Sequence, residues 1–388
     1  MKRLSLLILA AALCAGCSLK NTIENYMVGG KDNAEPPAPL VNFVPRLNVV
    51  QLWSKSIGDG TDKQYLELSP VQADQRLYVV DANGDLEALD ATNGQTIWHD
   101  DLDVHISGGP GYGDNSVLVG TSDGKVMAFS AGTGKKQWAA QVSSEVLSPP
   151  AKSQGIVVAR TGDGKLYGLD GDTGKAIWIY DRTVPSLSLR GTSPPVIAGD
   201  KVIAGFDGGR LTALDLHSGR LLWETAIAEP RGRSELERMV DIDAKPLVMD
   251  GFIYAGSFQG RLAAVRLETG QIVWARQLST YSGFTADDNS LYVTDATSQI
   301  MAIDRFTGTT VWKHDKLHAR EATGPAVIGK YLAVGDYAGY LHWMDKSSGR
   351  FVARTRPSEK RIIVKPLVVG KILYVYCTDG TLTAYTYR

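Results

Sequence analysis

One consensus phrase recurs along this chain roughly every 40 to 50 residues, Gly-x-(Leu/Val)-x-Ala-(Leu/Phe)-Asp-x-x-(Thr/Ser)-Gly-x-x-x-Trp. Six copies end on a tryptophan, and these residues are Trp98, Trp138, Trp178, Trp223, Trp274 and Trp312. A seventh copy has Ala353 at that place. An eighth starts at Gly380 and is cut short by the C-terminus, while its missing end lies at Val49 to Trp53. The two fragments add up to one repeat, so the chain contains eight.

Each repeat contains about four short runs of strand-forming residues. In one of them, Ile156 to Ala159 and Lys165 to Leu169 are separated by a Thr-Gly-Asp-Gly turn, and Ala176 to Ile179 follows an Asp-Thr-Gly turn. No stretch beyond the N-terminal segment keeps an apolar period of 3.6 long enough for a substantial helix. The pattern predicts an all-β fold, an eight-bladed β-propeller of four-stranded antiparallel blades over residues 47–388.

The split repeat predicts how the ring closes. The N-terminal strand that carries Trp53 is expected to pair with the blade formed by Val364 to Tyr387, which removes an open edge. The tryptophans are expected on the fourth strand of each blade, packed against a turn of the next blade, because burying an indole contributes about 4 kcal/mol. The aspartates that recur at one motif position are expected to stabilise turns rather than act as acid or base. They are Asp90, Asp170, Asp215, Asp304 and Asp345.

Composition argues against several classes of function. With 41 Lys and Arg against 42 Asp and Glu, the formal net charge is −1, and no basic run indicates nucleic-acid binding. Three cysteines exclude a disulfide scaffold, and Cys377 is expected to be a small core residue. No nucleophile elbow, Walker loop or paired-cysteine motif is present, so no catalytic residue and no cofactor is predicted. His314 and His318 are expected to be solvated loop residues rather than metal ligands.

The first twenty residues have the form of a secretory signal. Lys2 and Arg3 precede an apolar run that is too short to span a bilayer. The run ends Cys14-Ala-Gly-Cys17, which resembles a bacterial lipoprotein box, although such boxes usually have leucine in place of Cys14. Ordinary cleavage near Ala15 without a lipid is the alternative.

The lipoprotein resemblance implies three segments. Residues 1–16 are the signal peptide, and Cys17 becomes a lipidated N-terminus that carries acyl chains such as palmitate. Residues 17–46, which are polar and rich in proline, form a flexible tether. Ser18 fits transfer to the outer membrane, so the propeller of residues 47–388 is expected to be held at its periplasmic face.

The repeat resembles that of quinoprotein dehydrogenases, which bind pyrroloquinoline quinone and have a similar number of blades. Those enzymes use a calcium site of clustered carboxylates and amides, and a disulfide between adjacent cysteines over the cofactor. This sequence has no adjacent cysteines and no recognisable insert that carries metal ligands. A quinoprotein-type dehydrogenase is therefore the enzymatic alternative, and a protein without enzymatic activity is favoured.

Two intervals between copies exceed the others, and they start at Gly164 and Gly209. In both, the extra residues follow the tryptophan and precede the second strand of the next blade, within 181–191 and 229–243. Loops of one type in neighbouring blades lie on the same face of the ring. The two long loops should therefore form one contiguous patch, and long loops are where a propeller carries function.

Three segments of the sequence resemble the BamB family, the propeller lipoproteins of the outer-membrane β-barrel assembly machinery in Gram-negative bacteria. They are Pro185-Ser-Leu-Ser-Leu-Arg-Gly191, Asp241-Ile-Asp243 and Gly339-Tyr-Leu-His-Trp343, and the likeness runs from the signal peptide to the C-terminus. The residues that this resemblance implies for binding the POTRA domains of BamA are Leu187, Leu189, Arg190, Asp241 and Asp243. Two other interpretations stay open: the leucines alternate with serine as on a core-facing strand, and the aspartates have the chemistry of loop caps.

The resemblance implies a non-enzymatic scaffold that binds BamA and, through it, the other BAM lipoproteins, and that helps β-barrel proteins to fold and insert into the outer membrane. Apolar anchors beside an arginine and two carboxylates are typical of a compact interaction site. A propeller that holds unfolded substrate strands directly, by adding them to a sheet edge, is the alternative among binding functions.

Overall fold

The computed structural model describes residues 35–388 except 62, 186 and 190. The chain divides into two compact units, Met1–Pro37 and Ala38–Arg388, and all the strands described below belong to the second. The predicted signal peptide, Cys17 and most of the predicted tether lie outside the described residues, as does Arg190. In the part that is described, no helix is long and apolar enough to cross a membrane.

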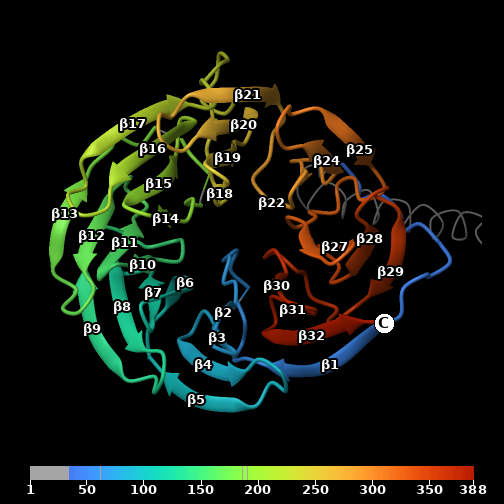
Figure 1. Cartoon of the computed structure of the whole chain (residues 1–388). Coiled ribbons are helices and arrows are strands. Elements are labelled where there is room, and N and C mark those ends of the chain that lie inside the picture. The colour runs from blue at the N-terminus through green and yellow to red at the C-terminus, as the bar shows by residue number, and fades with distance from the viewer. Residues whose placement is uncertain (1–34, 62, 186, 190) are drawn as a thin grey trace, which may run out of the picture. The chain divides into compact units, whose positions relative to one another are not determined.

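The described residues of the second unit form eight four-stranded antiparallel sheets, and each sheet is one blade of a ring (Figure 1). Blade 1 consists of β2 (Val71–Ala73), β3 (Arg76–Val80), β4 (Asp85–Asp90) and β5 (Thr96–Asp101). Blade 2 consists of β6 (Ile106–Gly113), β7 (Ser116–Thr121), β8 (Lys125–Ser130) and β9 (Lys136–Gln141). Blade 3 consists of β10 (Ala151–Ser153), β11 (Ile156–Arg160), β12 (Leu166–Asp170) and β13 (Ala176–Tyr180). Blade 4 consists of β14 (Val196–Ala198), β15 (Lys201–Phe206), β16 (Arg210–Asp215) and β17 (Leu221–Ala226).

The other four blades follow the same plan. Blade 5 consists of β18 (Leu247–Met249), β19 (Phe252–Gly256), β20 (Arg261–Arg266) and β21 (Ile272–Gln277). Blade 6 consists of β22 (Phe284–Ala286), β23 (Ser290–Thr294), β24 (Ile300–Asp304) and β25 (Thr310–His314). Blade 7 consists of β26 (Ala326–Ile328), β27 (Tyr331–Gly335), β28 (Leu341–Asp345) and β29 (Phe351–Thr355). Blade 8 consists of β30 (Leu367–Val369), β31 (Ile372–Tyr376), β32 (Thr381–Tyr387) and, from the other end of the propeller, β1 (Val49–Ser56).

The eight-bladed propeller and its closure by the N-terminal strand are confirmed. β1 pairs antiparallel with β32, from Val49 opposite Tyr387 to Ser56 opposite Thr381. In Figure 1 the two strands lie side by side and join the first and last parts of the propeller. Because the outermost strand of blade 8 comes from the start of the domain, unfolding of either end opens the ring.

Tryptophans on the outermost strands fasten seven of the eight described blades to the next, and blade 7, which has Ala353 at this position, is the exception. The indole N–H of Trp138 donates to the Gly171 carbonyl of blade 3 at 2.9 Å, and that of Trp178 donates to the Leu216 carbonyl of blade 4 at 2.8 Å. Trp53 completes the circle, because it donates to the Ala91 carbonyl of blade 1 at 3.3 Å. The turn that receives each indole has no room for a side chain: a Cβ on Gly174, whose φ is +71°, would lie 2.5 Å from the Trp138 ring. The predicted packing of the tryptophans is confirmed.

The recurring aspartates cap the turns between the third and fourth strands, as predicted. Asp170 Oδ1 accepts the backbone N–H of Thr173 at 2.8 Å and its hydroxyl at 2.7 Å. The hydrogen bond from the Thr173 side chain lowers the pKa of Asp170 below its ordinary value. Equivalent bonds are made by Asp90, Asp215, Asp304 and Asp345.

The segment before β1 is bound to blade 7. The backbone N–H of Ala38 donates to the His318 carbonyl at 2.9 Å, and that of Arg46 donates to the Val352 carbonyl at 2.8 Å. The Phe43 ring stacks on Phe351 with centroids 5.5 Å apart. Residues 38–46, which the sequence assigns to the tether, therefore have fixed partners on the propeller.

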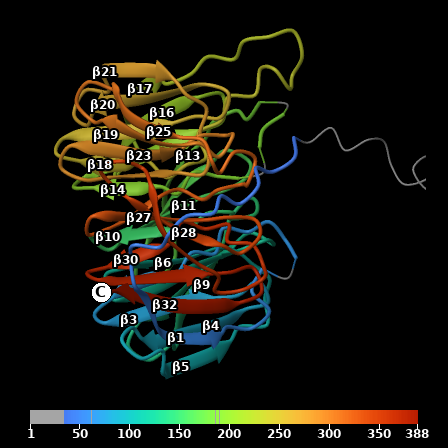
Figure 2. The ribbon, with the colours of Figure 1, turned by 90° about the vertical axis from the view of Figure 1, so that its right-hand side faces the viewer.

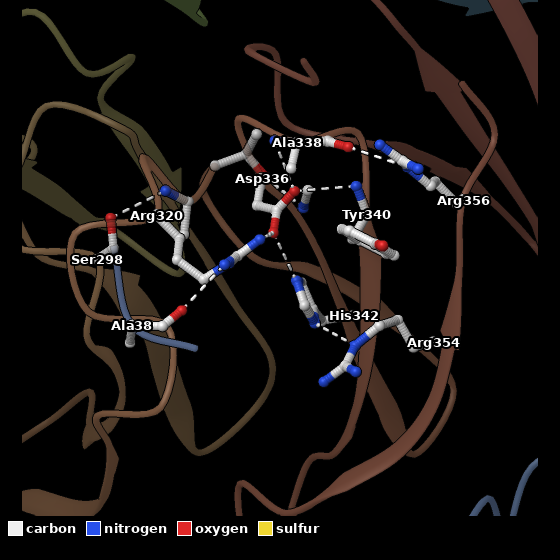
Figure 3. Close-up of polar contacts among 12 residues, drawn as sticks. Ala38, Ser298, Arg320, Asp336, Ala338, Tyr340, His342, Arg354 and Arg356 are labelled. Carbon is white, nitrogen blue, oxygen red and sulfur yellow. Dashed lines mark hydrogen bonds and ion pairs between the residues drawn. The ribbon is translucent and has the colours of Figure 1, made fainter. Parts of the chain in front are cut away.

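A buried ionic cluster lies beneath this segment (Figure 3). Arg320 donates from Nε to Asp336 Oδ2 at 2.8 Å and from its Nη1 group to the Ala38 carbonyl at 2.9 Å. His342 Nε2 lies 3.0 Å from the same Asp336 oxygen, and Arg354 Nε donates to His342 Nδ1 at 3.2 Å. Because Nδ1 accepts, the ring proton is on Nε2 and points to Asp336. Burial lowers the pKa of His342, which keeps this ring neutral.

Two further predictions concern single residues. Cys377 is 1% exposed and is a core residue, as predicted. His314 was expected in a solvated loop, and this is wrong: it lies in β25 with its ring 4.5 Å from that of Phe351. Burial lowers the pKa of His314 to about 4. The reason is that β25 runs one residue further than the sequence pattern indicates, so that His314 faces the next blade.

Candidate functional site: the patch of two long loops

The two long loops connect blade 3 to blade 4 and blade 4 to blade 5, and Asp241 joins them. Asp241 is 1% exposed. Its Oδ2 accepts the backbone N–H of Leu189 in the first loop at 2.7 Å. Its Oδ1 accepts the backbone N–H of Gly208, in the turn between β15 and β16, at 3.1 Å. One carboxylate in the second loop thus fixes the first loop against blade 4.

Asp243 lies beside this junction without a hydrogen-bond partner for either carboxylate oxygen in the part of the chain that is described, although both oxygens are buried. A Cβ on Gly191 of the first loop would lie 3.4 Å from Asp243 Oδ1, so the carboxylate borders that loop directly. Burial, and then the negative charge of Asp241, raise the pKa of Asp243 to about 8. Burial also raises the pKa of Asp241.

Arg160 and Asp207 complete the charged base of the site. Arg160 is at the end of β11 and is 1% exposed. Its guanidinium lies 3.1 Å from Asp207 Oδ1 and 4.9 Å from the centre of the Phe206 ring, and it also donates to the Gly205 carbonyl. Arg160, Asp207 and Asp241 all act on the pKa of Asp243, so one guanidinium and three carboxyl groups gather at the base of the patch among the described residues.

The first loop presents an apolar side chain to solvent. Leu187 is 42% exposed, and Leu189 is half-buried. Neither belongs to a strand, so the alternating leucines are not the core face of a strand. Loop capping, the other interpretation of the aspartates, describes Asp241 but not Asp243. Arg190 lies between Leu189 and Gly191, outside the described residues.

Both loops lie on one face of the ring. They belong to the same class of connection, from the outermost strand of one blade to the innermost strand of the next. The backbone N–H of Gly208, in the turn between the second and third strands of blade 4, donates to Asp241. The loops therefore lie on the face of the ring that carries the turns between second and third strands. Figure 2 shows the loop after β17 projecting from the same side as the segment that precedes β1. At its outer part, Leu236 is 62% exposed.

The sequence missed Arg160 and Asp207. Arg160 ends the apolar run that starts at Ile156, and this is the sequence signal that could have revealed the cluster. A buried arginine needs a partner, and only the fold shows which residue supplies it. Among the described residues, no group of three or more His, Cys, Asp or Glu side chains is placed to hold a metal ion.

Solved structures share the propeller architecture. BamB from Moraxella catarrhalis superposes with a TM-score of 0.80 at 27% identity, covering 87% of this chain and 99% of that one. A quinohemoprotein alcohol dehydrogenase from Comamonas testosteroni superposes with a TM-score of 0.69 at 14% identity, covering 87% of this chain and 76% of that one. The second likeness is one of fold alone.

Sequence relatives extend over the whole chain. The protein is 46% identical to outer membrane protein assembly factor BamB of Pseudomonas aeruginosa, over 100% of this chain and 99% of the relative. It is 34% identical to outer membrane protein assembly factor BamB of Escherichia coli, over 98% of this chain and 97% of the relative. The family model described as outer membrane protein assembly factor BamB matches residues 82–314 and 302–388. The chain belongs to the BamB family of outer membrane protein assembly factors.

Proposed function

We propose that this protein is a lipid-anchored scaffold of the outer-membrane β-barrel assembly machinery that binds the POTRA domains of BamA through the patch of two long loops. Through BamA it joins the other lipoproteins of the machinery, and it assists the folding and insertion of β-barrel proteins. The observation that carries the proposal is the junction at Asp241, which holds two exceptional loops together while Asp243 keeps both oxygens without a partner in the described chain.

The five predicted residues take different parts in this proposal. Asp241 is a positioning residue, because its two oxygens are already used by backbone N–H groups. Leu187 is an exposed apolar side chain, and its burial in a pocket of the partner would contribute about 1.5 to 3 kcal/mol. Leu189 supports the loop, while Arg190 and Asp243 supply the charged contacts. An arginine offers a planar fork of donors that suits carboxylates and carbonyls.

The same proposal includes the membrane anchor. Cys17 is the acylated residue, and several acyl chains on one residue give stable attachment to a bilayer. The relatives are named outer membrane protein assembly factors, which supports association with the outer membrane, and the signal and lipoprotein box favour its periplasmic face. Changing Cys17 to serine should release the protein from the membrane fraction. Recovery of unacylated wild-type protein in the soluble periplasmic fraction would contradict the anchor.

We propose that the protein has no enzymatic activity of its own. Its relatives are named as assembly factors, and the quinoprotein dehydrogenases share only the propeller fold with it at low identity. Two of the features that the dehydrogenase alternative requires, adjacent cysteines and an insert with metal ligands, are also missing from the sequence.

Copurification with BamA and binding to isolated POTRA domains test the patch. Arg190→Glu and Leu187→Ala should each weaken binding by more than tenfold while the melting temperature stays within a few degrees, because Leu187 is exposed and both positions lie between β13 and β14, outside the strands of the core. Lys371→Glu, in the turn between β30 and β31, is the matched control and should bind like wild type. If variants at all five residues copurify normally in folded form, the patch is not the BamA site. Loss of binding through Lys371 instead would place the site on the opposite face.

A further inference from the structure

The outermost strand of each blade pairs with only one other strand of its sheet, and one of them, β29, is also bonded through its Val352 carbonyl by the segment before β1. In every sheet the strand that carries the motif tryptophan position ends the strand order, so its outer N–H and C=O groups face the perimeter of the ring. Such edges invite pairing with another extended chain, and soluble proteins usually protect them with charged side chains. The eight edges of this propeller can be compared directly, since all eight strands lie within the described residues.

Seven of these edges are protected by charge, and the eighth is not. Charged residues are present in β1, β5, β9, β17, β21, β25 and β29, and examples are Lys55, Asp100, Lys136, Glu224, Arg276, Lys313 and Arg354. β13, the outermost strand of blade 3, reads Ala-Ile-Trp-Ile-Tyr and has no charged residue. The charged residues that protect the outer edges of the other blades are therefore missing from β13.

β13 also exposes two large apolar side chains on one face. Ile177 is 50% exposed and Ile179 is 54% exposed. Alternate residues of a strand share a face, so the two isoleucines lie opposite Trp178, whose indole packs on blade 4. At the equivalent pair of positions, β25 has Val311 and Lys313, so that one apolar residue is followed by a charge. Of the eight described edges, β13 is the one with a large apolar residue at both positions.

We propose that the free edge of β13 binds an extended segment of an unfolded β-barrel protein, which adds to blade 3 as a fifth strand. The edge supplies backbone hydrogen bonds, and Ile177 and Ile179 contact apolar side chains at every second position of the bound segment. Strands of membrane β-barrels have this alternation of apolar and polar residues. The choice of an unfolded β-barrel protein as the bound segment rests on the proposed function, because that function is the assembly of β-barrel proteins.

The place of β13 in the chain connects this edge to the loop patch. The strand ends at Tyr180, and the loop that contains Leu187 and Leu189 begins at the next residue. Exposed charges at both ends of the strand, Lys175 and Asp181, limit the uncharged edge to the strand itself. A segment bound there would lie beside the surface proposed for BamA, at the side of the ring where a client can pass from one protein to the other.

A synthetic peptide tests the edge directly. The probe is the fluorescein-labelled ten-residue peptide Lys-(Val-Thr)4-Lys, and its binding to the full mature protein in mild detergent is measured by fluorescence anisotropy. A second peptide has the same sequence with alternate amides methylated along one edge, which removes hydrogen-bond donors and keeps the side chains. We expect the methylated peptide and the Ile179→Lys variant each to lose at least tenfold in affinity. Hydrogen exchange of residues 176–180 should slow when the unmethylated peptide binds.

The matched control is Val311→Lys in β25, which places the same charge on another edge at a residue that is 58% exposed. Equal weakening by both lysine variants, or equal binding of both peptides, would show adsorption without strand pairing and would overturn the proposal. If Ile179→Lys instead dissolves a dimer and the peptide does not bind, the edge serves self-association. POTRA binding by Ile179→Lys should be normal, so failure of this proposal and failure of the BamA site give different results.

Discussion

Trp343 and Ala353 lie opposite one another in β28 and β29, and this pairing is the reverse of that in the other seven blades. Elsewhere a small residue of the third strand faces a tryptophan of the fourth. These pairs are Ala88–Trp98, Ala128–Trp138, Gly168–Trp178, Ala213–Trp223, Ala264–Trp274, Ala302–Trp312 and Ala384–Trp53. In blade 7 the indole has moved one strand inward, where Trp343 is 0% exposed and Ala353 is 4% exposed.

The exchange predicts a coupling between the two positions. Trp343→Ala should destabilise the protein by about 3 to 5 kcal/mol, because the deeply buried indole leaves a cavity. Ala353→Trp alone should also destabilise, by about 1 to 3 kcal/mol, because the space is already filled. The double variant has alanine on the third strand and tryptophan on the fourth, as in the other blades. Its loss of unfolding free energy should be smaller than the sum of the losses of the two single variants. Urea unfolding of the four proteins measures this coupling energy.

The control is the double variant Ala128→Trp with Trp138→Ala in blade 2. Trp138 bonds to the Gly171 carbonyl of blade 3, so moving this indole inward removes an interblade contact and should recover less stability. Additive effects in blade 7 would show that the two residues do not share one space.

Blade 7 illustrates what the repeat could and could not predict. Strand number, order and closure followed from the phrase because each blade buries the same small set of residues, and the structure confirms them. Ala353 registered in the sequence as a lost tryptophan, whereas Trp343, ten residues earlier, occupies the alanine position of the same phrase. The compensation depends on residues that face each other across two strands, and a motif read position by position does not contain that information.

Trp53 should contribute strongly to stability, because its strand closes the ring. Trp53→Ala should destabilise by about 3 kcal/mol, because the indole packs on the blade 1 turn and bonds to the Ala91 carbonyl. Leu52→Ala, at a neighbouring residue that is 43% exposed, should stay within about 0.5 kcal/mol of wild type. Chemical unfolding followed by tryptophan fluorescence compares the two. An unchanged midpoint for Trp53→Ala would mean that β1 does not hold the ring closed.

Arg320 should hold the segment before β1 in place. Arg320→Ala leaves the buried Asp336 without its guanidinium partner and removes the bond to the Ala38 carbonyl, so a loss of about 3 kcal/mol is expected. Hydrogen exchange should accelerate in residues 38–46. Arg356→Ala is the control, since Arg356 contacts Tyr340 and the Ala338 carbonyl at the surface. Unaltered exchange in the Arg320 variant would show that backbone bonds to blade 7 suffice.

The loop patch was only partly accessible from the sequence. Interval lengths indicated the two loops, and the family resemblance supplied five residues within them. The arrangement of Arg160, Asp207 and Asp243 could not be foreseen, because these residues come from two blades and a loop, and their energies depend on burial that arises when the blades pack. Asp241 and Asp243 have the same side chain but different roles, because of where the fold places them. Among the described residues, only Asp241 accepts hydrogen bonds from backbone N–H groups.

Asp243 should make stability fall as pH rises. Its pKa of about 8 in the folded protein lies above the ordinary value of 3.8, so between these pH values the folded state keeps a proton that the unfolded state has lost. Stability due to this proton is present in full below about pH 4 and declines by on the order of 1 kcal/mol per pH unit until the carboxyl ionises in the folded protein as well. In Asp243→Asn there is no carboxyl group to lose its proton on unfolding. The variant should therefore become more stable relative to wild type as pH increases from 5 to 8.

The same proton links the patch to its partner. If a cation of BamA pairs with Asp243, binding stabilises the ionised carboxylate, so wild-type affinity for POTRA domains should rise between pH 6 and pH 8. Asp243→Asn should bind more weakly and lose this part of the pH dependence, whereas Asp243→Glu should keep some of it. Unfolding curves and affinities measured across pH 5 to 8 separate the two effects. Parallel stability curves for wild type and Asp243→Asn would show that the carboxyl is ionised throughout, and a binding difference without a pH trend would assign Asp243 to loop geometry rather than to a charged contact.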